Sequence, residues 1–193
     1  MTKIAIVTGS VRPGRQSLTI AQWVKSIADQ RSDVEFEIVD IADHNLPVWQ
    51  EPMPPSMAPA ESPAGQAWSA RMAEFDGYVF VVSEYNHSIT GALKNALDYL
   101  YPELNNKAAG FVSYGSAGGA RAVEHLRGIL SEMQVAHVRN AVLLSLFTDF
   151  ENFATFTPTE PASASVEPML DQLVTWTKAL ESVRAPERET ASV

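Results

Sequence analysis

Two polar loops, each directly behind a short apolar run, hold the residues of this chain whose types and spacing could bind a charged ligand. The first loop, residues 8–17, reads TGSVRPGRQS and follows the apolar residues 4–7. The second loop, residues 83–88, reads SEYNHS and follows the apolar residues 78–82. A loop that leaves a buried parallel strand and enters a helix presents free backbone N–H groups. Two such loops side by side can hold one phosphorylated molecule.

The first loop carries donors that suit a terminal monophosphate. Ser10 and Ser17 can donate O–H bonds, and Arg12 and Arg15 can form paired bonds to phosphate oxygens. A helix that starts near Ser17 adds the partial positive charge of its N-terminus. The competing interpretation is a structural turn in which a serine caps the helix.

Two other interpretations of the first loop do not fit its sequence. Gly9 and Gly14 have the spacing of a nucleoside-triphosphate loop, but Arg15-Gln16 stand where such a loop needs Lys-Ser or Lys-Thr. Thr8-Gly9 is similar to the start of a short-chain dehydrogenase, yet the glycine spacing differs and the chain has no Tyr-x-x-x-Lys pair.

The second loop offers groups that suit a flat, uracil-like ring. Asn86 presents a donor and an acceptor at one edge, and Tyr85 can lie against a ring face. Glu84 is either a base or a solvated carboxylate at a strand end. His87 is either loop packing or a base, and Ser88 is a candidate cap for the helix that follows.

A third loop, residues 114–119, reads YGSAGG and consists almost entirely of small residues. Gly115, Gly118 and Gly119 allow the backbone to approach a planar ligand closely, and a tight strand-to-helix turn is the alternative. No Gly-x-Gly-x-x-Gly is present, so the dinucleotide fingerprint is absent.

Alternation of strands and helices along the chain predicts an α/β fold with a doubly wound parallel sheet covered by helices on both faces. The strands at residues 3–8 and 78–82 are apolar on both faces and therefore central, whereas residues 34–40 alternate and suit an edge. The strand order 2-1-3-4-5 fits this pattern and brings the three loops to one crevice. The expected strands are residues 3–8, 34–40, 78–82, 108–113 and 141–146, and the expected helices are residues 17–30, 63–75, 89–101, 118–134 and 166–183.

Composition narrows the classes of partner and chemistry. The chain of 193 residues has a formal charge of −9 and no cysteine. The acidic balance argues against a nucleic-acid binder and against docking on an anionic membrane. Without cysteine, redox chemistry needs a bound cofactor. No apolar run approaches the roughly 18 residues of a membrane span, and the start lacks a signal-peptide layout, so we expect a cytoplasmic protein.

The motifs at residues 9–15, 84–98 and 114–119 resemble the NADPH-dependent FMN reductases of flavodoxin-like fold, and the resemblance covers roughly residues 3–135. It implies FMN as cofactor and NADPH or NADH as electron donor. It further implies that the phosphate is held by Ser10, Arg12, Arg15, Gln16 and Ser17. The ring would be lined by Glu84, Tyr85 and Asn86 and covered by Gly115, Ser116 and Gly118. Ser83 departs from the family, which usually has proline at the entry to the second loop.

The expected activity is an FMN-dependent NAD(P)H oxidoreductase that passes electrons to a quinone, an azo compound, a metal oxyanion or free flavin. The flavin carries the chemistry, so no catalytic side chain and no metal site is expected. The alternative is a flavodoxin-like electron carrier, or a flavin-binding redox sensor, without NAD(P)H oxidation of its own. The resemblance also implies a homodimer or homotetramer, although an amphipathic helix of a monomer explains residues 89–101 nearly as well.

Three segments have open interpretations. We expect residues 1–184 to form one FMN-binding domain and residues 185–193 to be a disordered tail. The proline-rich residues 42–63 are expected to be ordered padding rather than a flap, because Trp49 and Met53 could pack them down. Residues 147–164 are expected to be irregular, with their four phenylalanines in the protein's own core rather than over a neighbour's site.

Overall fold

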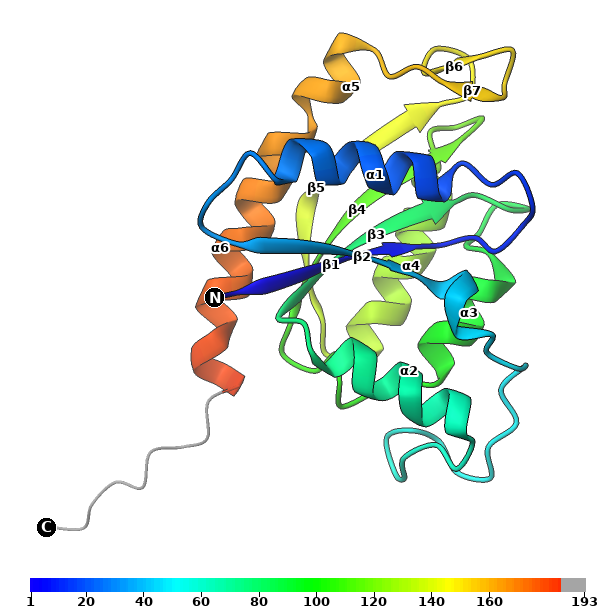
Figure 1. Cartoon of the computed structure of the whole chain (residues 1–193), viewed down its shortest axis with the longest axis vertical. Helices are drawn as coiled ribbons and strands as arrows, with labels where there is room; N and C mark the ends of the chain where they lie inside the picture. The colour runs from blue at the N-terminus through cyan, green and yellow to red at the C-terminus, as the bar shows by residue number, and fades with distance from the viewer. Residues whose placement is uncertain (185–193) are drawn as a thin grey trace, which may run out of the picture.

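The computed structural model describes residues 1–184, which contain a five-stranded parallel sheet in the order β2-β1-β3-β4-β5 (Figure 1). Its strands are β1 (Lys3–Thr8), β2 (Glu35–Asp40), β3 (Gly77–Ser83), β4 (Ala108–Gly115) and β5 (Ala136–Ser145). The predicted α/β fold and strand order are confirmed. The order is that of flavodoxin-like sheets.

Burial separates central strands from edge strands as the sequence predicts. Every residue of β3 and β4 is buried, whereas β2 and β5 mix buried with exposed positions. The parallel register pairs Thr8 with Val81 and with Asp40, and Ser83 with Tyr114. The carboxyl ends of these strands therefore meet at one edge of the sheet, and the three loops leave from it.

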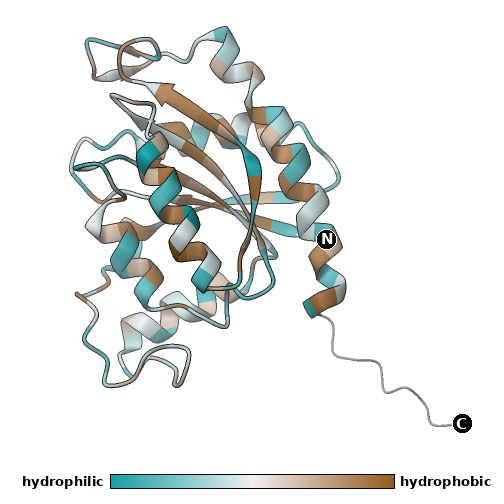
Figure 2. Ribbon diagram, turned by 180° about the vertical axis from the view of Figure 1, so that it is seen from behind, coloured by the Kyte–Doolittle hydropathy of each residue, from teal (hydrophilic) through white to brown (hydrophobic). Residues whose placement is uncertain are grey.

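Helices cover both faces of the sheet, and each face has its own apolar core. On one face, α1 (Ser17–Ala28) and α6 (Val166–Arg184) pack Ile20, Val24 and Leu170 against the strands. On the other face lie α2 (Pro63–Ala73), α3 (Gly91–Asp98) and α4 (Ala120–Glu132). Figure 2 shows hydrophobic residues concentrated on the strands and hydrophilic residues on the outer helix surfaces.

Several helix boundaries differ from the predicted ones because local backbone geometry overrides periodicity. Gly118 and Gly119 have positive φ angles, so the fourth helix begins at Ala120 rather than at residue 118. Thr90 is extended, and its side chain accepts a hydrogen bond from the Leu93 N–H, so the third helix begins at Gly91 rather than at residue 89. Thr90 is therefore the cap of α3, and the expected role of Ser88 as a cap is wrong. The helices predicted at residues 17–30, 63–75 and 89–101 also end earlier, at Ala28, Ala73 and Asp98.

The last strand and the segment after it are more regular than predicted. β5 begins at Ala136, five positions before the expected start, and its pairing with β4 shifts register between Ala109 and Phe111. Residues 147–164 contain a small hairpin, β6 (Phe150–Glu151) with β7 (Thr155–Phe156), and the helix α5 (Glu160–Ala164).

The four phenylalanines of this segment divide into two pairs. Phe150 is buried and Phe156 packs on Trp23, with ring centroids 5.2 Å apart. Phe147 and Phe153 are exposed and contact each other edge to face. The expectation of a core role is thus correct for the first pair and wrong for the second.

The proline-rich connection is ordered and held down, as expected, although not by Met53, which is exposed. It opens with the short 3-10 helix η1 (Ile41–His44). Asn95 of α3 then accepts a hydrogen bond from the Trp49 N–H at 2.8 Å and donates one to the Pro47 carbonyl at 2.8 Å. Glu51 accepts hydrogen bonds from the backbone N–H groups of Glu61 and Ser62, which closes the loop on itself.

Within residues 1–184, no helix has both the length and the apolar character needed to cross a bilayer. The expected disordered tail, residues 185–193, lies outside the described part of the chain.

Candidate functional site

The first loop is held in a compact conformation by hydrogen bonds around Ser10. Ser10 is buried, and its hydroxyl lies 3.4 Å from the Arg12 N–H, which can donate to it. Ser17 donates to the Ser10 carbonyl at 3.4 Å, and Thr90 donates to the Gly9 carbonyl. A Cβ on Gly9 would lie 2.5 Å from the Val81 carbonyl oxygen, so only glycine lets the loop run this close to β3.

The first turn of α1 has no side-chain cap. Gln16 occupies the N-cap position without a side-chain hydrogen bond to the helix, whereas Ser62, Thr90 and Thr159 cap α2, α3 and α5. The leading N–H groups of a helix have no intrahelical partner and attract anions. The expected alternative, a turn capped by a serine, is therefore not what this loop forms.

Arg15 is anchored by a residue that sequence reasoning missed. Asp40, the last residue of β2, is buried and accepts bonds from Arg15 at 2.5 Å, from the Thr8 hydroxyl at 2.8 Å and from the Ala42 N–H at 3.1 Å. Burial raises the pKa of Asp40, but these hydrogen bonds outweigh burial and leave the pKa below its usual value. The Arg15 Nε–H is buried and has no partner.

The second loop is a tight turn. Tyr85 and Ser88 exchange backbone hydrogen bonds of 2.9 and 3.1 Å, and the two residues between them, Asn86 and His87, have φ angles of 49° and 73°. Positive φ at both central positions defines a type I′ turn. The turn exposes the Tyr85, Asn86 and His87 side chains, and Ser83 at its entry is buried and donates to the Tyr114 hydroxyl at 2.6 Å.

Tyr85 joins the first two loops. Its hydroxyl oxygen accepts a hydrogen bond from Arg12 Nε at 3.0 Å and lies 3.2 Å from the Ser10 hydroxyl. Residues some 75 positions apart in the sequence thus share one contact, as the predicted strand order requires.

The third loop is shaped by its glycines. A Cβ on Gly119 would lie 2.7 Å from the Ser113 Cβ and 2.8 Å from the Tyr114 nitrogen, so the loop folds back onto β4 more tightly than any other residue would allow. The Ser113 hydroxyl donates a hydrogen bond to the Gly118 carbonyl at 2.7 Å, which holds the loop against β4. Ser116 is exposed at the tip, whereas Gly115 and Gly118 are buried.

Glu84 is not the solvated carboxylate at a strand end that one interpretation of the second loop expected. Its side chain is only 4% exposed and forms an ion pair with Arg121, the second residue of α4. A Cβ on Gly115 would lie 3.1 Å from the Glu84 Cβ, so the Glu84 side chain passes close beneath the third loop. Sequence reasoning also missed Arg121, although its position just behind the third loop was an available signal.

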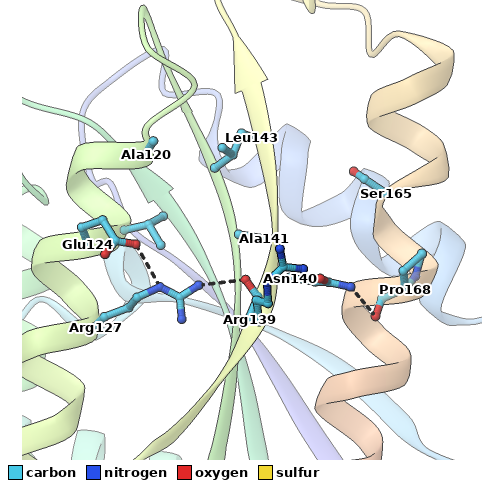
Figure 3. A pocket seen from close by; sticks show the side chains of 10 residues that line it. Ala120, Glu124, Arg127, Arg139, Asn140, Ala141, Leu143, Ser165 and Pro168 are labelled. Atoms are coloured by element: carbon cyan, nitrogen blue, oxygen red, sulfur yellow. Dashed lines mark hydrogen bonds and ion pairs between the residues drawn. The ribbon is translucent and has the colours of Figure 1, made fainter.

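The larger hollows of the surface lie elsewhere. A cavity of about 530 Å³ between α4, β5 and α6 is lined by Arg127, Arg139 and Asn140 (Figure 3), and one of about 590 Å³ lies beside α3. Neither is lined by a predicted site residue. In the first, Arg127 donates to the Arg139 carbonyl and pairs with Glu124, so its charge is already compensated.

Comparison with known proteins places the chain in a family. Residues 2–149 match the family model described as NADPH-dependent FMN reductase. The chain belongs to this family. The expected family, oxidoreductase class and cofactors, FMN with NAD(P)H, are thereby confirmed.

Individual relatives agree with this assignment. The chain is similar to an NAD(P)H-dependent FMN reductase of Nectria sp, with 40% identity over 158 residues, covering 77% of this chain and 79% of the relative. It is similar to a quinone reductase of Escherichia coli strain K12, with 34% identity over 138 residues, covering 66% and 70%. The solved flavoenzyme NAD(P)H:(acceptor) oxidoreductase of Paracoccus denitrificans shares the fold, with a TM-score of 0.73, 20% identity and coverage of 93% and 98%.

The polar groups of the site suit a ligand of the FMN reductase family. Within residues 1–184, four buried side-chain polar atoms lack a hydrogen-bond partner, and three of them belong to Arg15, Glu84 and Arg121 around these loops. Buried polar groups are nearly always paired, so these exceptions call for an explanation. Uncapped helix amides, two serine hydroxyls and the guanidinium groups of Arg12 and Arg15 fit a phosphate.

Proposed function

We propose that the three loops bind FMN, with the phosphate at the first loop and the isoalloxazine ring between the second and third loops. The observation that carries this proposal is the uncapped N-terminus of α1 directly beside Ser10, Arg12 and Ser17. Tyr85 supports it, because its hydroxyl contacts both Ser10 and Arg12 while its ring belongs to the second loop. Residues 1–184 would act as one FMN-binding domain.

The residues of the site have separate tasks in this proposal. Arg12, Ser10, Ser17 and the backbone around Gln16 bind the phosphate, and Asp40 orients Arg15. Asn86 and the backbone of the second loop recognise the ring edge. Ser116, with Gly115 and Gly118, covers the ring from the third loop and limits the access of water.

FMN, when bound, takes a hydride from NADPH or NADH and passes two electrons to an acceptor. No side chain of the three loops has to donate or accept a proton for that chemistry. We propose a quinone as the acceptor, with azo compounds, metal oxyanions and free flavin as further candidates. The exposed Tyr85 and Ser116 leave one side of the site open to such a planar molecule.

We further propose a cytoplasmic homodimer or homotetramer. The support for assembly is a hollow of about 590 Å³ beside α3. Its lining combines apolar residues, among them Trp49, Leu97, Leu100, Ile129 and Met133, with the charged Lys94, Asp98 and Glu132. Light scattering on a sizing column tests the assembly, and a mass of one chain at micromolar concentration would refute it.

The cofactor proposal is tested by flavin titration of the purified protein. We expect FMN fluorescence to be quenched on binding. Arg12→Ala should weaken binding by about 1–3 kcal/mol because a charge-assisted hydrogen bond is lost. Arg139→Ala, at an exposed position of β5 away from the loops, is the matched control and should bind normally. Equal FMN affinity in the wild type and Arg12→Ala would refute the placement of the phosphate.

The activity is tested separately by NADPH and NADH oxidation with and without a quinone. Consumption that depends on both FMN and the quinone supports the proposal. An FMN-loaded protein that oxidises neither nucleotide would be an electron carrier instead.

A further inference from the structure

The ion pair between Glu84 and Arg121 is unusual for its place in the molecule. The Glu84 side chain is 4% exposed, yet only one of its oxygens is paired, and the Arg121 Nε–H is likewise buried without a partner. Burying a carboxylate is seldom repaid by its attraction to one cation, least of all when some of the bonds are missing and the Arg121 side chain is still 41% exposed. Stability alone therefore does not account for this pair.

The pair ties the second loop to α4. Glu84 lies between β3 and the turn, and Arg121 lies in the first turn of α4. One helical turn further along, His125 Nδ1 lies 2.9 Å from the Ser88 hydroxyl. The two ends of the second loop are thus held by neighbouring positions on one face of α4.

The charge balance of the pair matters for anything bound between these loops. Together the two groups are neutral. Loss of Arg121 leaves a carboxylate that is only 4% exposed, where its field is weakly screened, whereas loss of Glu84 leaves a guanidinium group that is 41% exposed and more strongly screened. Reduction makes a bound flavin more negative. A nearby positive charge therefore favours the reduced flavin, and a negative charge disfavours it.

We propose that Glu84 and Arg121 are positioning residues whose compensated charges set the reduction potential of the bound FMN. This inference rests on the proposed FMN site. It adds to that site a residue of α4 outside the three loops, and it assigns the acidic residue of the second loop a partner other than the flavin.

The test compares the affinities of variants for oxidised FMN and for FMN reduced by dithionite, by titration at pH 9 without oxygen. Glu84→Gln leaves the Arg121 cation uncompensated. We expect the ratio of the two dissociation constants to shift about tenfold in favour of reduced FMN, which corresponds to a midpoint potential about 30 mV more positive.

Three further variants distinguish an effect of charge from an effect on folding. Arg121→Gln leaves the carboxylate uncompensated and should shift the ratio in the opposite direction, so it keeps the test available if Glu84→Gln does not fold. The double variant carries no charge at either position and should return to the wild-type ratio. Arg184→Gln, which breaks the ion pair with Asp76 directly before β3 at the opposite edge of the sheet, should leave the ratio unchanged.

Opposite shifts in the single variants with recovery in the double variant support the proposal. An unchanged ratio, or shifts of the same sign in both single variants, would overturn it and leave the pair a purely structural tie. Absence of FMN binding to the wild-type protein would instead refute the proposed function, so the two failures are distinguishable.

Discussion

Lys107 offers a quantitative test of how the sheet is packed at the edge opposite the three loops. Lys107 directly precedes β4 and is only 7% exposed. Its ammonium group lies 3.3 Å from the Ala73 carbonyl oxygen and 3.2 Å from the Tyr78 hydroxyl oxygen. Burial, helped by the nearby charge of Arg184, lowers the pKa of Lys107 from 10.5 to about 8, although the Asp76 and Glu103 carboxylates oppose the shift.

The sign of the pH dependence follows from this pKa. Below pH 8 the amine is charged in both the folded and the unfolded protein, so the folded state bears the full cost of burying the charge. Between pH 8 and 10.5 the folded protein releases the proton first, and stability rises with pH. The difference between about 8 and 10.5 corresponds to about 3 kcal/mol at 1.36 kcal/mol per pKa unit.

Lys107→Met removes this dependence while keeping a long apolar side chain. Urea unfolding of both proteins at pH 7 and pH 9.5 should show the wild type gaining about 2 kcal/mol relative to the variant between the two pH values. Other titrating groups are common to both proteins and cancel. Lys178→Met, at an exposed position of α6, controls for loss of a surface charge. An identical pH dependence in wild type and Lys107→Met would refute the reasoning, and FMN affinity should be unchanged.

Three further predictions concern the loops. Asp40→Asn leaves Arg15 without its counter-charge and should lower the free energy of unfolding by about 3 kcal/mol at pH 7. Because the pKa of Asp40 is lowered in the folded state, this difference in unfolding free energy between wild type and variant, measured by urea titration, should shrink as the pH falls below about 4. Gly119→Ala adds a Cβ 2.7 Å from the Ser113 Cβ at a φ of +74° and should lower both thermal stability and FMN affinity. Gly128→Ala, in contrast, adds a Cβ to an open position inside a helix and should stabilise the protein by about 1 kcal/mol. His87→Gly relieves a φ of 73° in the type I′ turn and should raise Tm by about 2–4 °C; a lower Tm by calorimetry would contradict the assigned turn.

The architecture was predictable because burial dictates it. Residues 78–82 are apolar without interruption, which is typical of a strand covered on both faces, and the alternation of residues 34–40 marks an edge. Once the order was set, the meeting of Arg12 with Tyr85 followed from the parallel register. Helix ends were less predictable, because Thr90 and Gly119 fix them through backbone angles that periodicity does not contain.

The ion pairs between different elements could not be predicted from the sequence. Asp40 is the last residue of β2 and Arg121 lies two residues after the third loop; each appears alone in the sequence as an ordinary charged residue. Only the fold brings Asp40 to Arg15 and Arg121 to Glu84. In both cases the partner is a loop residue that the resemblance assigns to FMN.

These two ion pairs indicate how the site divides its charges. One guanidinium nitrogen of Arg15 bonds to Asp40, whereas the Arg15 Nε–H has no partner. One carboxylate oxygen of Glu84 bonds to Arg121, whereas the other has no partner. A side chain that is anchored at one end and unpaired at the other is fixed in place without being saturated, which lowers the entropy lost when a ligand orders it. The same arrangement is costly without a ligand, because buried polar atoms lose their hydration. FMN should therefore raise the stability of this protein by more than the same ligand would in a variant with Arg15 and Asp40 replaced by apolar residues.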